Sequence, residues 1–269
     1  MSNMTIEAGD DGLSARAVIL DLLSTDRAAT YSVADLIRAG AVFGIGPAGV
    51  RTAITRLKAD QRLRQEARGL YAIGPEGEPL QHRILGWRTV PARRREWNGE
   101  WLIALAGPRE RADRTVWRRT MRALELEGFV EAETNLWVRP DNLDEGAAGV
   151  RDRLGELDHA PSLLVVAASG LDTVRRRRFG LLWDGKAIAV GHRRLSLALD
   201  RSRVRLDGAE LQVAAAETLT LGRQAVRRIV RDPLLPDEFC SPDALTGLIA
   251  AMDLYDQFGK AVWRRYLAM

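Results

Sequence analysis

The segment from Ser32 to Ile73 constrains the fold of this chain more than any other part. A helical pattern covers Ser32 to Gly40, and a second one runs from Ala48 to Lys58 after the corner Gly44-Ile45-Gly46-Pro47. Glycine permits the sharp turn, and proline suits the first helical position because no intrahelical hydrogen bond is lost there. A basic hairpin pattern follows directly from Leu63 to Ile73. Two short helices, a tight turn and a β hairpin together predict a winged helix-turn-helix.

The second helical pattern separates into two faces. At about 100° per residue, the apolar residues of one arc are Val50, Ala53, Ile54 and Leu57. The opposite arc carries polar residues and no acid, namely Arg51, Thr52, Thr55 and Lys58, with Arg56 beside it. Arginine can bind a guanine edge bidentately, and threonine can bond a phosphate or contact a thymine methyl. We therefore expect Arg51, Thr52, Thr55 and Arg56 to read or anchor in the major groove of DNA.

The hairpin pattern adds further cations beside this helix. Arg62, Arg64 and Arg68 precede Gly69, after which Leu70 to Ile73 is the expected returning strand. Arginine at the tip of such a hairpin contacts phosphate or the minor groove. We expect Lys58, Arg64 and Arg68 to make these contacts. A solvated surface explains any one of these cations, and it is their combination with the turn and hairpin that favours DNA.

The corner also matches the pattern G-x-G-x-x-G from Gly44 to Gly49. In a dinucleotide site this pattern follows a buried strand and precedes a ribose-binding acid by about 20 residues. Here only Ala41-Val42-Phe43 separates the corner from a helical run, and Glu66 lies in the hairpin. Pro47 also removes an N–H group that a phosphate would use. We expect no nucleotide cofactor at this corner, and no other cofactor is indicated.

Composition indicates an intracellular protein of two or three compact units. The chain has 269 residues and a net charge of +4, and domains usually contain 50–250 residues. Cys240 is the only cysteine, so no intrachain disulfide forms and a reducing, cytoplasmic location fits. No apolar run approaches the length of a membrane span, and Met1 to Gly12 lacks the pattern of a signal peptide. We expect this N-terminal stretch to be a disordered tail.

After the hairpin, the predicted secondary structure changes from mixed strands and helices to helices alone. Strand patterns at Trp101–Ala106, Phe129–Val138 and Ser162–Ala168, with a helical pattern at Glu110–Gly128, predict a ferredoxin-like α+β module. Helical patterns dominate from Gly170 onward. The predicted class is α+β, and the predicted segments are a tail (1–12), a winged-helix DNA-binding domain (13–80), a basic linker (81–96), a ferredoxin-like domain (97–169) and a helical domain (170–269).

Two basic runs outside the hairpin are further candidates. Arg93, Arg94 and Arg95 form one run, and Arg118 and Arg119 are adjacent in the predicted helix of the central module. Such a run is most often a solvated surface. For Arg93 to Arg95 the functional alternatives are a further phosphate contact or a clamp on an anionic effector, and Arg118 and Arg119 are candidates for binding the effector.

Signatures of catalysis and metal binding are missing from the sequence. The three histidines, His82, His159 and His192, form no H-x-x-x-H pair, and no C-x-x-C, phosphate-binding loop or nucleophile elbow occurs. No pair of acids stands out as general acid and base. We therefore expect no catalytic residue, no metal ligand and no enzymatic activity.

Three blocks of this chain resemble the PaaX family of bacterial transcriptional repressors. They are Gly49–Leu57 with Gly69-Leu70-Tyr71; Trp97–Trp101 with Arg118, Arg122, Leu124, Gly128-Phe129 and Leu136–Pro140; and Arg228–Pro236 with Leu254-Tyr255. The resemblance implies a winged helix, a central domain similar to Cas2 proteins and a helical C-terminal domain. It also implies a homodimer that binds a palindromic double-stranded operator and is released by an acyl-CoA such as phenylacetyl-CoA. For the effector of this chain we expect an acyl-CoA or an aromatic carboxylate.

The chain departs from the family pattern at two places. Pro242 to Gly247 lacks the tryptophan of the family's Trp-Pro-Gly-like segment, and the hairpin keeps only Arg68-Gly69 of a double-basic pattern. Both differences concern the effector and the operator more than the fold. The leading hypothesis is a ligand-responsive repressor of an aromatic or acyl-CoA catabolic operon. The alternatives are a Cas2-like metal-dependent nuclease, although Gly107-Pro108 follows the first strand without an acid, and a winged helix that binds proteins.

Overall fold

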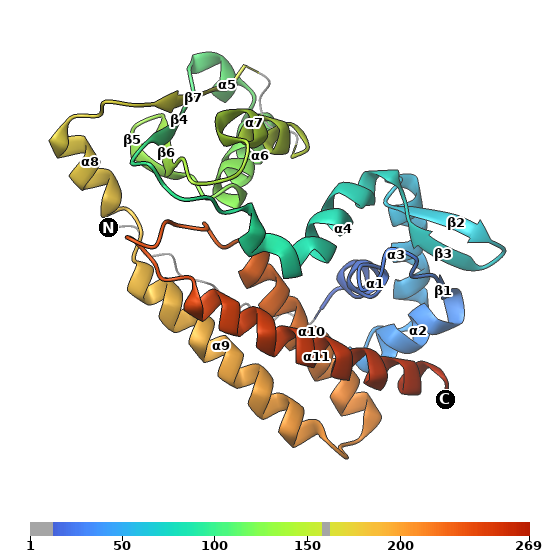
Figure 1. Cartoon of the computed structure of the whole chain (residues 1–269). Helices are drawn as coiled ribbons and strands as arrows, with labels where there is room; N and C mark the ends of the chain where they lie inside the picture. Colours follow the sequence, from blue (N-terminus) through green and yellow to red (C-terminus); the bar gives the residue numbers. More distant parts are fainter. Residues whose placement is uncertain (1–12, 158–161) are drawn as a thin grey trace. The chain divides into compact units, whose positions relative to one another are not determined.

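The computed structural model describes residues 13–157 and 162–269, and it confirms the predicted α+β class. Its described helices accompany two small antiparallel sheets. The chain divides into two compact units (Figure 1). Unit 1 contains residues 13–85, 208–220 and 259–269, and unit 2 contains 86–157, 162–207 and 221–258. The predicted tail, 1–12, lies outside the described residues, and the five predicted segment boundaries stay predictions.

Unit 1 begins with α1 (Ala15–Leu23). The Ser14 side chain caps this helix by accepting a hydrogen bond from the N–H of Ala17 at 3.3 Å. Its inward face is formed by the buried residues Val18, Ile19, Leu22 and Leu23. The spacing of three and four residues between these apolar side chains matches the period of an α-helix.

Helices α2 (Val33–Val42) and α3 (Pro47–Ala59) follow, joined by a tight turn. Ser32 and Asp35 form a capping box at the start of α2, in which each side chain accepts the other residue's backbone N–H. Gly44 lies in the left-handed region at φ +69°, and Pro47 is the first residue of α3. Because a helix precedes the corner, the buried strand that a dinucleotide fingerprint requires is not found there.

The sheet of unit 1 has the strand order β1-β3-β2, and every neighbouring pair is antiparallel. Its strands are β1 (Tyr31–Ser32), β2 (Leu63–Ala67) and β3 (Leu70–Ile73). Gly69, at φ +76°, makes the turn between β2 and β3. The hydrophobic core of unit 1 consists of residues from α1, α2, α3 and the sheet, among them Ile19, Leu36, Val50, Leu57 and Ile73.

The passage from Gly74 to Gln81 is helical from Pro75 onward, although it contains two glycines and two prolines. It contains a 3₁₀ turn, η1 (Pro75–Gly77), and the start of α4 (Glu78–Leu85). The buried side chain of Gln81 donates to the carbonyl oxygen of Leu23 at 2.9 Å and to that of Asp26 at 3.3 Å. These bonds to α1 and the loop after it are a tertiary contact that local sequence does not reveal.

The sheet of unit 2 has the strand order β5-β6-β4-β7 and is also antiparallel throughout. Its elements, in chain order after the 3₁₀ helix η2 (Gly86–Arg93), are β4 (Trp101–Leu105), α5 (Pro108–Ala112), α6 (Arg114–Leu126), β5 (Val130–Glu133), β6 (Leu136–Pro140), α7 (Gly146–Gly155) and β7 (Leu164–Ala168). The chain order is therefore strand, helices, two strands, helix and strand. Leu102, Leu124, Val150 and Val165 contribute to the core between sheet and helices.

Two expectations for this region were wrong in detail. The single helix expected at Glu110–Gly128 is divided at Asp113, which has an extended ψ of 109° and caps α6 by accepting from the N–H groups of Thr115 and Val116. The single strand expected at Phe129–Val138 is a hairpin of β5 and β6, and Asn135 adopts φ +65° at its turn. Aspartate and asparagine favour these irregular positions because their short polar side chains bond nearby backbone groups.

A buried ionic network lies beside this sheet. Glu127 Oε2 is 2.9 Å from both Arg93 Nη2 and Arg153 Nε, and the Glu127 side chain is fully buried. Arg139 is also buried, and burial lowers its pKa to about 10. Its guanidinium donates to the carbonyl oxygens of Glu127 and Pro233. This network joins the sheet to the corner Asp232–Pro236 within unit 2.

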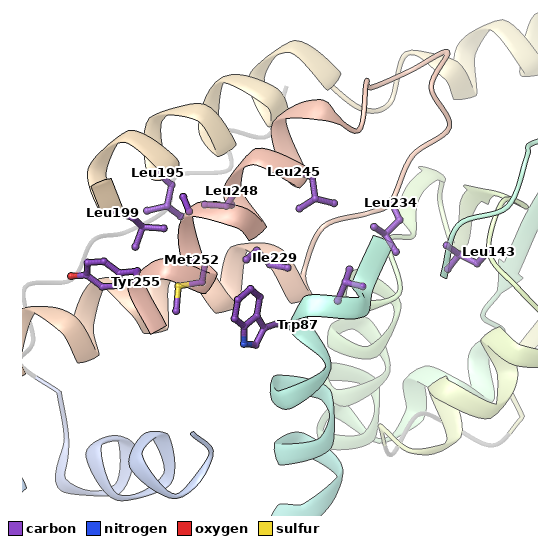
Figure 2. Packing of buried hydrophobic residues seen from close by; sticks show 13 residues of the cluster. Trp87, Leu143, Leu195, Leu199, Ile229, Leu234, Leu245, Leu248, Met252 and Tyr255 are labelled. Atoms are coloured by element: carbon purple, nitrogen blue, oxygen red, sulfur yellow. The ribbon is translucent and has the colours of Figure 1, made fainter. Parts of the chain in front are cut away.

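The rest of unit 2 is helical. It consists of α8 (Thr173–Gly180), α9 (Gly185–Leu206) and parts of α10 (Leu211–Val230) and α11 (Asp243–Leu267), whose other parts belong to unit 1. Figure 2 shows the apolar core formed by these elements with η2, in which Leu195, Leu199 and Leu248 lie near Met252. Ser202 Oγ and Tyr255 Oη are hydrogen-bonded at 2.8 Å. Across 13–157 and 162–269, no helix combines the length and apolarity that a membrane span requires.

Candidate nucleic-acid interface

The orientation of α3 within unit 1 follows from its apolar face. Val50, Ile54 and Leu57 are buried, and Ala53 packs partly against the same core, as the sequence predicts. These side chains contact residues of α1 and α2, so the helix cannot rotate without exposing them. The opposite face of α3 is consequently turned to solvent.

Every candidate DNA-binding residue of α3 is exposed. The group comprises Arg51, Thr52, Thr55, Arg56 and Lys58. The Thr55 hydroxyl donates to the carbonyl oxygen of Arg51 at 3.0 Å, which leaves its oxygen available as an acceptor. Within the part of the chain that the structure describes, the guanidinium groups of Arg51 and Arg56 form no ion pair. Two unpaired guanidinium groups and two small hydroxyls therefore share this surface with one ammonium group.

Lys58 links α3 to the hairpin. Its ammonium group donates to Gln65 Oε1 at 3.1 Å and lies 5.7 Å from the centre of the Tyr71 ring. A cation over an aromatic face is attracted by the ring quadrupole. Lys58 thus serves partly to hold β2 and β3 beside the end of α3, a role that the sequence pattern did not indicate.

The two candidate arginines of the hairpin differ in their surroundings. Arg64 is exposed but already pairs with Glu66 and with Glu78, the latter at 3.2 Å. Arg68 lies next to the Gly69 turn, is exposed and, in residues 13–157 and 162–269, has no ion-pair partner. Arg68 is therefore the more available of the two for binding a phosphate, because Arg64 would first have to break its ion pairs with Glu66 and Glu78.

The candidate effector residues of the first basic run have carboxylate partners. Arg93 pairs with Glu127 at 2.9 Å, Arg94 with Asp237, and Arg95 with Asp141 at 2.8 Å. Arg118 and Arg119 are exposed on α6. The structure thus places one run in structural ion pairs and the other on a helix surface, and their binding of an effector stays a prediction.

Two single residues of chemical interest pack into unit 2. His192 is buried with its Nε2 atom 3.1 Å from Asp232 Oδ2. Burial raises the pKa of the half-buried Cys240 thiol, which keeps it in the less reactive protonated form. Among the described residues, no group of three or more His, Cys, Asp and Glu side chains is arranged to hold a metal ion.

A cationic surface on α8 and α9 was not among the predicted sites. Arg175, Arg176, Arg177 and Arg178 are consecutive in the sequence and all exposed. This four-residue run was the signal that could have identified the surface. It is longer than the Arg93–Arg95 run, which was among the predicted effector residues.

Comparison with known proteins shows the fold alone. No family model matches the chain, and no curated protein matches its sequence. Among solved structures, the chain is similar to the uncharacterized protein Rv0674 from Mycobacterium tuberculosis, with a TM-score of 0.57 and 23% sequence identity. The similarity covers 94% of this chain and 98% of that one. At this identity the comparison indicates a common architecture and leaves the function to be argued from the residues.

Proposed function

We propose that this protein is a DNA-binding transcriptional regulator of the PaaX type, with a winged helix-turn-helix in unit 1. The observation that carries the proposal is the exposed, acid-free face of α3 beside a basic hairpin. A helix with such a face can enter the major groove, where arginine and threonine contact base edges. The sheet order β1-β3-β2 supports the assignment, because β2 and β3 form the hairpin expected of a wing.

Each candidate residue has a role in this proposal. Arg51, Thr52, Thr55 and Arg56 read or anchor in the major groove. Lys58, Arg64 and Arg68 contact phosphates or the neighbouring minor groove, with Arg68 the most available. The three sequence blocks shared with the PaaX pattern support the same function, and the β-α-β-β-α-β order of unit 2 supports a ferredoxin-like central domain.

The proposal includes a homodimer on a palindromic operator in the cytoplasm. Two copies of α3 about 34 Å apart, or at a multiple of that distance, would match half-sites in successive turns of the duplex. Light scattering of the chain with and without operator measures this directly. A particle of one 29.8 kDa chain under both conditions contradicts the dimer.

Selection of bound duplexes from a random-sequence library tests DNA recognition with no operator sequence assumed. The full chain is compared with the double variant Arg51→Ala/Arg56→Ala and with the control Arg264→Ala/Arg265→Ala. The control removes two exposed cations near the end of α11, also in unit 1. We expect the full chain and the control to enrich one two-fold symmetric sequence, and the α3 variant to enrich none. Absence of any enriched sequence for the full chain overturns the proposal.

The effector is proposed to be an acyl-CoA or an aromatic carboxylate that weakens operator binding. Calorimetry with phenylacetyl-CoA, free coenzyme A and phenylacetate separates recognition of the acyl group from recognition of the phosphates. Arg118→Gln tests the exposed run on α6, since this side chain is in no ion pair within the described residues. No heat of binding and no loss of DNA affinity with any of the three compounds rejects this part of the proposal.

A further inference from the structure

The positive charge of this chain is concentrated outside the proposed DNA-reading helix. Residues 173–206, which include α8 and α9, contain ten Arg or Lys and two Asp or Glu, a net charge of +8. The whole chain has a net charge of only +4, so the remaining residues together carry −4. Pro47 to Arg68, by comparison, has six bases and two acids. Unit 2 therefore contains a more basic segment than the α3 region of unit 1.

Four of the six cations of helix α9 lie on one side of the helix. Its inner face is buried through Leu195, Leu199 and Ser202. The outer face, an arc of roughly 100° at 100° per residue, contains four exposed cations: Lys186, Arg193, Arg194 and Arg201. At 1.5 Å per residue they extend over about 22 Å of helix. In the described parts of the chain, none of the four has an ion pair or a side-chain hydrogen bond.

Helix α8 adds two more cations of the same kind. Arg175 and Arg178 approach Glu133 at 3.5 Å, and Arg175 also pairs with Asp172 at 2.9 Å. Arg176 and Arg177 are exposed and, within 13–157 and 162–269, lack such partners. Six exposed cations on two consecutive helices thus have no carboxylate partner among the residues that the structure describes. Such a surface attracts polyanions.

The composition of this surface favours a nucleic acid over a membrane. Five of the six unpaired cations are arginines, whose planar guanidinium groups match phosphate oxygens bidentately. The large exposed apolar residues of this surface are Val174 of α8 and Val190, Leu197 and Val204 of α9, and no exposed aromatic residue accompanies them. Interfacial membrane helices instead bury a broad apolar face, often with Trp or Phe.

We propose that α8 and α9 form a second nucleic-acid contact surface that binds phosphates of duplex DNA without regard to sequence. The choice of DNA as the polyanion rests on the proposed function, whereas the surface itself belongs to unit 2 and involves no residue of α3. Phosphate contacts position a protein on DNA and carry no sequence information directly. This surface would raise the affinity for all duplexes and leave the preference for the operator to α3.

The test is the salt dependence of DNA binding by the full chain. The variant Arg176→Gln/Arg177→Gln/Arg194→Gln/Arg201→Gln removes four unpaired cations. The control Arg111→Gln/Arg114→Gln/Arg122→Gln/Arg151→Gln removes four exposed cations from α5, α6 and α7 of the same unit. Each phosphate contact contributes about 0.9 to the slope of log K against log salt concentration. We expect the slope of the α8–α9 variant to be smaller by about 3.6 with random and selected duplexes alike, and the control to keep the wild-type slope.

Three results distinguish this inference from the proposed function. If the α8–α9 variant keeps the wild-type slope, or if the control loses as much, the inference is overturned while recognition by α3 stands. If Arg51→Ala/Arg56→Ala keeps sequence preference but the α8–α9 variant loses slope, recognition by α3 is overturned and the surface stands.

Vesicles of equal parts phosphatidylcholine and phosphatidylserine provide the third arm. Binding to these vesicles without binding to DNA identifies a membrane surface and overturns the inference. Circular dichroism verifies that all variants are folded.

Discussion

A Cβ atom added to Gly40 would lie 2.6 Å from Cγ2 of Val50. Helices α2 and α3 therefore approach each other at a point where only glycine fits without displacement. Val50 is buried at this contact, and the next residue along α3, Arg51, is turned about 100° away toward solvent. The close approach of these two helices thus determines which residues of α3 are presented on the surface.

Gly40→Ala is expected to destabilise unit 1. Overpacking a tight contact costs about 1–3 kcal/mol, whereas alanine gains about 1 kcal/mol over glycine in a helix. We expect a net loss of about 1 kcal/mol, together with weaker DNA binding. Thermal unfolding measures the first effect. Gly247→Ala in α11 is the control, because a Cβ there meets nothing within 4 Å and should stabilise the protein by up to about 1 kcal/mol.

Arg51→Ala is expected to weaken binding to the selected operator by about 1–3 kcal/mol if its guanidinium group contacts a base bidentately. The variant should also discriminate less among the four bases at one position of the operator. Lys58→Ala should instead weaken binding to every duplex equally and reduce the salt slope by about 1. Competition binding with operator variants separates the two results. Unchanged affinity and preference in Arg51→Ala removes this residue from base recognition.

Glu127→Gln is expected to destabilise unit 2 strongly. The substitution leaves the guanidinium groups of Arg93 and Arg153 without their shared buried carboxylate. Breaking a buried ion pair on one side costs about 3–5 kcal/mol. Glu133→Gln, which removes a carboxylate that is 33% exposed and is shared by Arg175 and Arg178, should cost no more than about 1 kcal/mol. Denaturant unfolding curves of the two variants make the comparison, and equal losses contradict it.

Asp35 is expected to contribute an acid-sensitive part of the stability of unit 1. Partial burial acts to raise the pKa of Asp35, but hydrogen bonds from Ser32 and Arg38 outweigh this effect and hold the pKa below its usual value. A carboxyl whose pKa is lower in the folded state stabilises that state above its unfolded pKa of about 4, and this contribution is lost as the pH falls through the folded value. Asp35→Asn should therefore reduce stability at pH 7 and reduce it less in acid. An equal loss at pH 7 and pH 3 contradicts this assignment.

Local sequence patterns were sufficient to predict the buried residues wherever a helix has a single buried face. The inward residues of α1 and α3 follow from apolar spacing, and Pro47 and Gly44 mark the turn through backbone preferences that neighbours do not alter. The break at Asp113 and the hairpin at Asn135 were missed although both carry turn residues. Their flanking segments remain periodic enough to be read as one continuous element.

The sequence by itself determined the α+β class, the two faces of α3 and the cations beside it, because side-chain periodicity and turn preferences are properties of short segments. Only the tertiary structure decided which arginines are paired. Arg93, Arg94 and Arg95 are adjacent in sequence, yet their carboxylates come from residues between 34 and 143 positions further along the chain. Arg176 and Arg193 have no such partner within the described residues. Charge pairing depends on distances in space, and those distances are set by how the helices and sheets pack.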